Sequence, residues 1–187
     1  MVYISRIYTK AGDGGQTGLG DGSRVWKNSR RVIAIGEVDE LNAVVGLAIA
    51  AGTPEADLLR SIQNDLFDIG ADLCVPVMDG ETNVLRMVPS QSDRLEREID
   101  RLNSRLAPLH SFVLPGGSQA AAWLHLARTV CRRAERSFVE LMQAEPINPN
   151  VLIYLNRLSD LLFVLARVAN DDGKGDVLWV PGRSRNS

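Results

Sequence analysis

The feature that most constrains the fold is a series of apolar segments with a helical period, separated by proline and glycine. In the clearest of them leucine and isoleucine recur every three or four residues. A helix of this length spans about 30 Å, so several such helices can lie side by side. We therefore predict an all-α, five-helix bundle. The five predicted helices cover about Ser29–Ala51, about Glu55–Cys74, a third segment capped by Ser90 or Ser92, about Ser118–Gln143, and a last segment from the end of "PINPN" to about Asn170.

The chain length of 187 residues suits a single domain, 1–187, with a sizeable core. Within it we expect a glycine-rich arm over residues 1–28, the helical bundle over 29–171 and a C-terminal tail over 172–187. Strand signals are weak along the chain. Only "YISRIYT" and "DVLWVP", near the two ends, are expected to form short extended pieces, and both should lie on the bundle surface.

Charge and composition exclude several classes of partner. A net charge of −2 gives no electropositive field of the kind that attracts nucleic acid. The longest apolar run, "AVVGLAIAAG", is about half of the roughly 20 residues that span a bilayer, so no membrane association is expected. The N-terminus resembles neither a signal peptide nor a transit peptide, which predicts a cytoplasmic protein. Cys74 and Cys131 lie in apolar helical segments and indicate free thiols.

The run "TKAGDGGQTGLGDGSRVWK" suggests a phosphate-binding loop of an unusual kind. It lacks the lysine and hydroxyl of a P-loop, it has Thr17 where a dinucleotide fingerprint needs glycine, and Arg24 stands where an EF-hand needs glutamate. Consecutive glycines can nevertheless turn backbone N–H groups towards an anion. Lys10, Thr17, Ser23 and Lys27 would add donors. A flexible arm rich in turns is an equally acceptable interpretation of these residues.

A polar stripe borders the apolar face of the fourth predicted helix. Arg128, Arg132 and Glu135 fall within about 60° of one another on a helical wheel, beside the apolar arc. Charges at the edge of a core are costly unless they are paired or hold an anion, so we expect either a ligand site or an internal Arg–Glu pair. Further polar stripes on the fifth and first helices contain Asn156, Asp160, Phe163 and Arg167, and Asp39, Asn42 and Gly46, whereas Arg133, Arg136 and Glu140 are expected to face solvent.

Histidine chemistry is not expected to drive a reaction here. His110 and His125 are the only histidines of the chain, and their spacing is not that of metal ligands. Both are interpreted as structural or surface residues. No metal ligand is identifiable directly in the sequence.

Four blocks of sequence, in order and spread over nearly the whole chain, resemble the PduO-type ATP:cob(I)alamin adenosyltransferases. Ala11 departs from the family pattern, which commonly has Thr or Asn there, and Gly14 stands where a polar residue is frequent. The four blocks are "YTKAGDGGQTGL", "RVWKNSRRVIAIGEVDELNAVVG", "FVLPGGSQAAAWLHLARTVCRRAERSFVEL" and "NPNVLIYLNRLSDLLFVLAR".

The resemblance implies an enzyme that transfers the 5'-deoxyadenosyl group of ATP to the Co(I) of cob(I)alamin, giving adenosylcobalamin and triphosphate. Co(I) is itself the nucleophile, which agrees with the lack of a histidine base. It implies Mg²⁺ carried with the ATP phosphates, and a homotrimer with active sites between subunits. A corrinoid reductase and an adenosylcobalamin-dependent enzyme are the implied partners. The alternative function is a non-catalytic carrier of corrinoid or nucleotide that delivers cofactor to a client enzyme.

The resemblance also assigns roles to residues. Arg128 would pair with Asp39 across the subunit interface, while Phe112 would pack under the corrin ring with Phe163 lining the same pocket. The implied catalytic residues are Arg128, Arg132, Asp39 and Phe112, and the implied corrinoid-binding residues are Asp39, Phe112 and Phe163. The implied ATP-binding residues are Thr9, Lys10, Ala11, Gly12, Asp13, Thr17, Gly18 and Lys27 of the arm, with Arg132, Arg133, Glu135, Arg136 and Asn156 of the neighbouring subunit.

Overall fold

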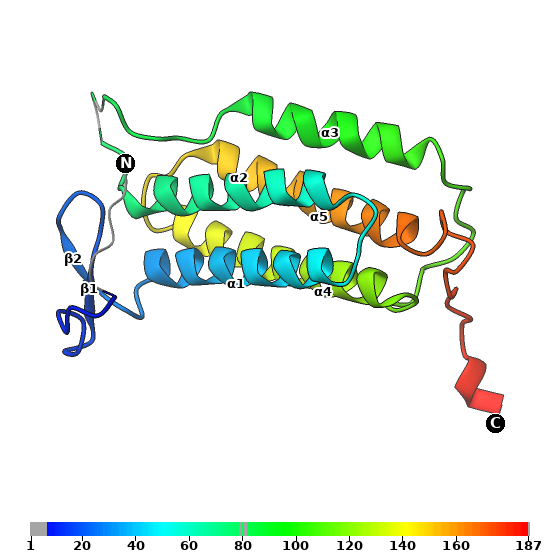
Figure 1. Ribbon diagram of the computed structural model, residues 1–187. Coiled ribbons are helices and arrows are strands. Elements are labelled where there is room, and N and C mark those ends of the chain that lie inside the picture. Colours follow the sequence, from blue (N-terminus) through cyan, green and yellow to red (C-terminus); the bar gives the residue numbers. More distant parts are fainter. Residues whose placement is uncertain (1–6, 79, 81, 187) are drawn as a thin grey trace.

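A computed structural model describes residues 7–78, 80 and 82–186, and it has five long helices arranged as a bundle (Figure 1). The predicted all-α fold is confirmed. The elements are β1 (Gln16–Gly18), β2 (Arg24–Trp26), α1 (Arg30–Ala50), α2 (Ala56–Cys74), α3 (Pro89–Asn103), α4 (Gln119–Met142), α5 (Pro149–Val168) and the short 3₁₀ helix η1 (Arg183–Asn186).

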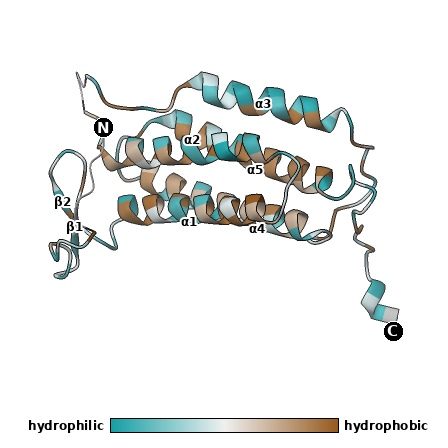
Figure 2. Ribbon diagram, viewed as in Figure 1, coloured by the Kyte–Doolittle hydropathy of each residue, from teal (hydrophilic) through white to brown (hydrophobic). Residues whose placement is uncertain are grey.

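The helices pack in a fixed order of neighbours. α1 packs against α2 and α4, and α5 packs against α4 and α3. Their apolar sides face one another, as the hydropathy colouring shows (Figure 2). The hydroxyl of Tyr154 on α5 donates to the carboxylate of Asp65 on α2 over 2.6 Å, which joins two residues that lie 89 positions apart in the sequence. The core therefore closes around a buried polar contact as well as around apolar side chains.

Local signals explain most helix ends. Ser29 and Ser118, near which the first and fourth helices were predicted to begin, accept backbone N–H bonds as N-caps of α1 and α4. Gly52 follows α1 with φ of +83°, a conformation that favours glycine. The predicted capping of α3 by Ser90 or Ser92 is wrong. Pro89 occupies the first turn because its fixed φ suits that position, and both serines lie inside the helix.

The arm contains a small β-hairpin that the sequence did not predict. β1 and β2 pair antiparallel, with Thr17 opposite Val25. The expected extended piece "YISRIYT" lies partly outside the described residues, and residues 7–9 form no strand. The second expected piece, "DVLWVP", does extend along the surface, where Leu178 forms a bridge with Val113. Among the residues that the structure describes, no helix is both long and apolar enough to cross a membrane.

Candidate functional site

The glycine-rich loop of the arm folds on itself in tight turns. The N–H groups of Asp13 and Gly15 donate to the carbonyls of Lys10 and Gly12 over 3.3 and 3.1 Å. A Cβ atom added to Gly12 would lie 3.0 Å from the ammonium nitrogen of Lys27, so glycine at this position lets the lysine approach the backbone. The loop thus combines a tight backbone with a cation held beside it.

Contacts that sequence reasoning missed hold the arm in place. The guanidinium of Arg24 donates to the carbonyl of Ala11 over 2.7 Å and closes the loop. Gly20 donates its N–H to the carbonyl of Cys74 over 2.8 Å, which ties the arm to the end of α2. A Cβ at Gly20 would lie 2.7 Å from a methyl group of Val75, so only glycine allows this approach. The arm is therefore docked on the bundle at the end where α2 finishes.

The face formed by α4 and α5 carries the predicted polar stripe. Arg132 is exposed and Arg128 is half-buried beside the core, as the helical wheel indicated. Burial lowers the pKa of Arg128, and the neighbouring charge of Arg132 lowers it further. The buried Nε of Arg128 has no hydrogen-bond partner among the described residues. Two close cations, one of them incompletely paired, give this face a local affinity for negative charge.

A hollow between α4 and α5 brings together two further predicted residues. The Asn156 amide donates to the Glu135 carboxylate over 3.0 Å, and the hollow around them has a volume of about 320 Å³. Arg157, which donates to Asn156 over 3.1 Å, is a member of this cluster that the sequence did not single out. Its position directly after Asn156 is the sequence feature that could have indicated its membership of the cluster. The hollow can therefore offer an amide and a carboxylate to a bound molecule.

Of the three charged residues predicted to face solvent, Arg136 and Glu140 are exposed, whereas Arg133 is partly buried. Arg133 of α4 forms ion pairs with Glu37 and Glu40 of α1. Glu140 is paired with Arg30 over 3.1 Å, at the beginning of α1. The charge of Arg133 is therefore balanced within the chain. Its predicted role in ATP binding stays a prediction, as does that of Arg136.

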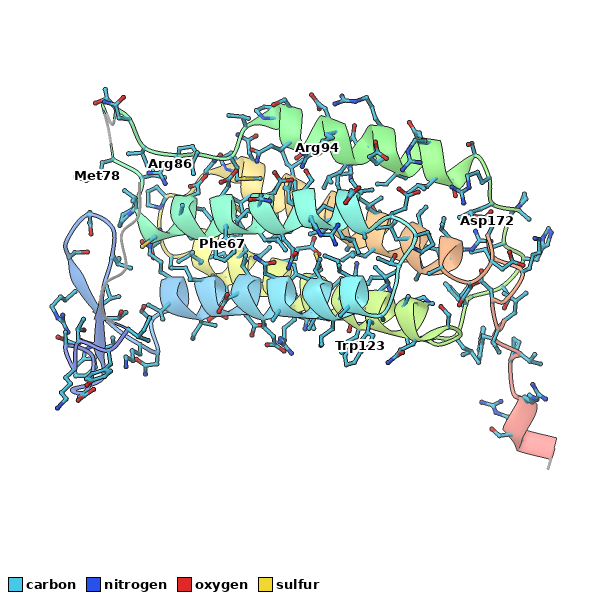
Figure 3. All side chains as sticks on the ribbon, viewed as in Figure 1. Phe67, Met78, Arg86, Arg94, Trp123 and Asp172 are labelled. Carbon is cyan, nitrogen blue, oxygen red and sulfur yellow. The ribbon has the colours of Figure 1, made fainter. Side chains whose placement is uncertain are left out.

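The predicted residues of α1 border a groove on a different face of the bundle. Asp39 is exposed at a groove of about 500 Å³ between α1 and α2, and no described Lys or Arg forms an ion pair with it. Asn42 is held by α2, since its amide donates to the carbonyl of Gln63 over 3.2 Å. Phe67, 70% exposed, projects from α2 beside this groove (Figure 3). In the sequence, Phe67 stands beside the apolar stripe of α2 and not on it, and this position could have indicated that its side chain is exposed.

One copy of the chain does not gather the predicted site. The arm lies at the end of the bundle where α1 begins, and the tail that contacts Phe112 lies at the opposite end (Figure 1). α1 has 21 residues, so these ends are separated by about 30 Å. Asp39 borders the groove between α1 and α2, whereas Arg128 lies on α4, which contributes no residue to that groove. The predicted site residues therefore fall into two groups, one on the arm and α1, the other on α4, α5 and the segment around Phe112.

Comparisons with known proteins identify the family. The family model described as cobalamin adenosyltransferase matches residues 7–169. The chain belongs to this family. The corrinoid adenosyltransferase of Mycobacterium tuberculosis is 53% identical over 192 residues, which cover 100% of this chain and 98% of that protein. The cobalamin adenosyltransferase of Cupriavidus metallidurans is 53% identical over 180 residues, covering 94% and 95% of the two chains.

A solved structure supports the same assignment. It is a variant of the PduO-type ATP:corrinoid adenosyltransferase of Lactobacillus reuteri, complexed with cobalamin and ATP. That protein is 41% identical to this chain, with a TM-score of 0.88, and the match covers 94% of this chain and 97% of the other. The predicted PduO-type family, bundle fold and enzyme class are confirmed. The roles of individual residues in this adenosyltransferase stay predictions.

Two residues of the polar stripes have structural contacts in this adenosyltransferase. Arg167 is buried, and its guanidinium donates to Asp176 over 2.8 Å, so it serves the fold rather than the open face. Phe163 lies on α5 with its ring 6.2 Å from that of His125. The two nitrogens of His125 are buried without a hydrogen-bond partner in the described part of the chain. This histidine is therefore a core residue, not a surface one.

The environment of His125 predicts a pH dependence of stability. Burial lowers the pKa of His125, Arg128 lowers it further, and Asp176 acts in the opposite direction. Below about pH 6.5 the unfolded chain takes up a proton that the folded protein binds less readily. The free energy of unfolding therefore decreases as the pH is lowered. In urea unfolding at several pH values, His125→Leu should reduce this slope by up to about 1.4 kcal/mol per pH unit. Parallel curves for the two proteins would contradict the prediction.

Proposed function

We propose that this protein transfers the 5'-deoxyadenosyl group of ATP to the Co(I) of cob(I)alamin and releases triphosphate. The observation that carries the proposal is the presence, on one chain of this family, of two separate groups of polar residues, which we propose to be the two half-sites of one active site. One is the glycine loop with Lys27, and the other is the α4–α5 face with Arg132, Glu135 and Asn156. Because Co(I) supplies the nucleophile, the protein needs to position and to stabilise charge, not to provide a base.

In this reaction the departing triphosphate gains negative charge as the bond to the ribose C5' breaks. Lys10 and Lys27 of the arm and Arg132 of α4 are exposed cations that bind it and stabilise that charge. Glu135 and Asn156, already joined by a hydrogen bond, orient the nucleoside. Phe112 and Phe163 exclude water from the face of the corrin ring. Each residue acts by binding or by orientation, in agreement with the lack of a histidine base.

Magnesium is expected to arrive with the nucleotide. No group of three or more His, Cys, Asp or Glu side chains in the described ranges could hold a metal ion. Mg²⁺ commonly takes one or two carboxylates and completes its shell with phosphate oxygens and water. Glu135 at the α4–α5 hollow is a carboxylate of this kind, and its Oε1 accepts a hydrogen bond from Asn156. When bound, the ion would neutralise part of the triphosphate charge.

The active assembly is proposed to be a homotrimer with sites between subunits. Within one chain no ion pair joins the exposed Asp39 to Arg128, whose Nε has no partner among the described residues, and this supports a contact between copies. The apolar groove with the exposed Phe67 offers the α1–α2 face as part of that contact. Light scattering should give about three times the mass of the 20.5 kDa chain. A monomer mass at micromolar concentration would refute the assembly.

The activity itself is tested directly with reduced cobalamin and ATP. Addition of the protein should replace the absorbance spectrum of cob(I)alamin by that of adenosylcobalamin, with triphosphate as the second product. Omission of ATP should leave the Co(I) spectrum unchanged. If the protein binds both compounds while the Co(I) spectrum persists, the enzyme proposal fails and the carrier alternative gains support.

A further inference from the structure

The segment around Phe112 is paired with the beginning of the C-terminal tail. Leu114 donates its N–H to the carbonyl of Val177, and Trp179 donates its N–H to the carbonyl of Phe112, both over 2.8 Å. Ser111 adds a third bond, from its hydroxyl to the carbonyl of Trp179 over 2.7 Å. Three hydrogen bonds thus fix the backbone on both sides of Phe112 against one short strand.

The segment around Phe112 and the C-terminal tail, which these hydrogen bonds join as a short ladder, are both held near one buried ion pair. Arg167 and Asp176 have side chains 7% and 3% exposed, and their contact is 2.8 Å long. The same guanidinium donates to the carbonyl of Ala107 over 3.0 Å, a few residues before Phe112. Asn170 donates to Asp176 over 3.1 Å and accepts from the N–H of Ser118 over 2.9 Å. The tail and the α3–α4 connection are therefore fastened to the end of α5 together.

Trp179 then makes the side-chain contact with Phe112. The two ring centroids are 6.0 Å apart and the rings are tilted by 53°. This is the tilted geometry in which aromatic pairs attract beyond simple burial. Phe112 is 77% exposed, and an exposed side chain without a neighbour would sample several rotamers. The indole is thus placed to restrict the conformations of Phe112.

We propose that Trp179 is a positioning residue for Phe112, which the tail presents in one orientation to the corrin ring. This inference rests on the proposed function for the role of Phe112, and on the ladder and the ring contact for the role of Trp179. Trp179 acts through Phe112 and need not touch the reacting atoms. The tail from Asp176 to Trp179 then belongs to the same half-site as α4, α5 and the segment around Phe112, although it follows the last helix of the bundle.

The kinetic test compares Trp179→Ala, Trp179→Phe and the control Val180→Ala, which alters a neighbouring exposed side chain. Trp179→Ala should raise KM for cobalamin about tenfold and leave KM for ATP unchanged. It should also decrease the absorbance of four-coordinate cob(II)alamin bound with ATP. Trp179→Phe, which retains a ring, should restore most of both properties, and Val180→Ala should resemble the wild type. Equal losses for both substrates with a lowered Tm, or no loss at all, would overturn the proposal.

A readout that needs no activity separates this inference from the proposed function. The chain has four phenylalanines, so incorporation of 4-fluorophenylalanine gives four ¹⁹F signals, and Phe112→Leu identifies one of them. Trp179→Ala should move that signal towards the position of free fluorophenylalanine, and Trp179→Tyr, which retains a ring without adding a fifth phenylalanine, should shift it less. If the signal is unchanged in Trp179→Ala, Trp179 does not position Phe112. If the wild type has no transferase activity but this shift occurs, only the proposed function fails.

Discussion

Replacement of Arg132 by alanine is expected to lower kcat for adenosyl transfer by about 100-fold or more while the protein stays folded and trimeric. Loss of a single preorganised donor to developing charge has an effect of this size in other enzymes. Arg132 is exposed, and the core beside it consists of apolar side chains, so truncation leaves no cavity. Steady-state kinetics, thermal unfolding and light scattering would test the three parts of this prediction.

Arg97→Ala is the matched control for that variant. Arg97 is also an exposed arginine on a helix, but it belongs to α3, which contributes no predicted site residue, and no described ion pair involves it. Its removal changes the net charge equally and should leave kcat unchanged. If Arg132→Ala unfolds or dissociates, or if both variants lose activity alike, the α4–α5 face is structural and the site assignment is wrong.

The second large effect is recovery of activity when two inactive variants form a mixed assembly. Lys27→Ala damages the arm and Arg132→Ala damages α4, so each homogeneous protein should be nearly inactive. If every site takes an arm from one subunit and α4 from the next, a random mixture contains intact sites in about a quarter of positions. Co-expression with two affinity tags, followed by double purification and assay, should therefore restore a substantial fraction of wild-type activity.

A second pair of variants controls the complementation. Arg132→Ala and Asn156→Ala both damage the α4–α5 half-site, so no site in their mixture can be intact. This mixture should stay inactive at any ratio of the two chains. Recovery in neither mixture would indicate that the arm and α4 of the same chain work together, and the proposal of sites between subunits would be abandoned.

Sequence reasoning predicted the features of the fold that depend on neighbouring residues. The apolar periodicity predicted five helices, and Ser29 and Ser118 marked two of their ends, because a cap acts within one turn. The hairpin escaped notice because strands of three residues are too short to show alternation. Its stability depends instead on contacts such as that of Arg24 with Ala11.

The candidate site was predicted less completely because its contacts join distant segments. A helical wheel places Arg133 away from the core, but it does not reveal that Glu37 and Glu40 of α1 lie opposite. The spacing of Arg167 suggested a ligand stripe, yet its partner Asp176 comes from the tail. Pairing between elements depends on which helices become neighbours, and periodicity does not contain that information.

The contact between the arm and α2 makes one cysteine a natural reporter. A Cβ at Gly20 would lie 3.6 Å from the sulfur of Cys74, so the docked arm covers part of this half-buried side chain. Burial raises the pKa of Cys131, whose thiol donates to the carbonyl of Leu155 over 3.2 Å, so this second cysteine should resist alkylation. The rate at which a thiol reagent labels Cys74 should therefore rise when the arm lifts from the bundle, which makes this natural residue a reporter of arm movement.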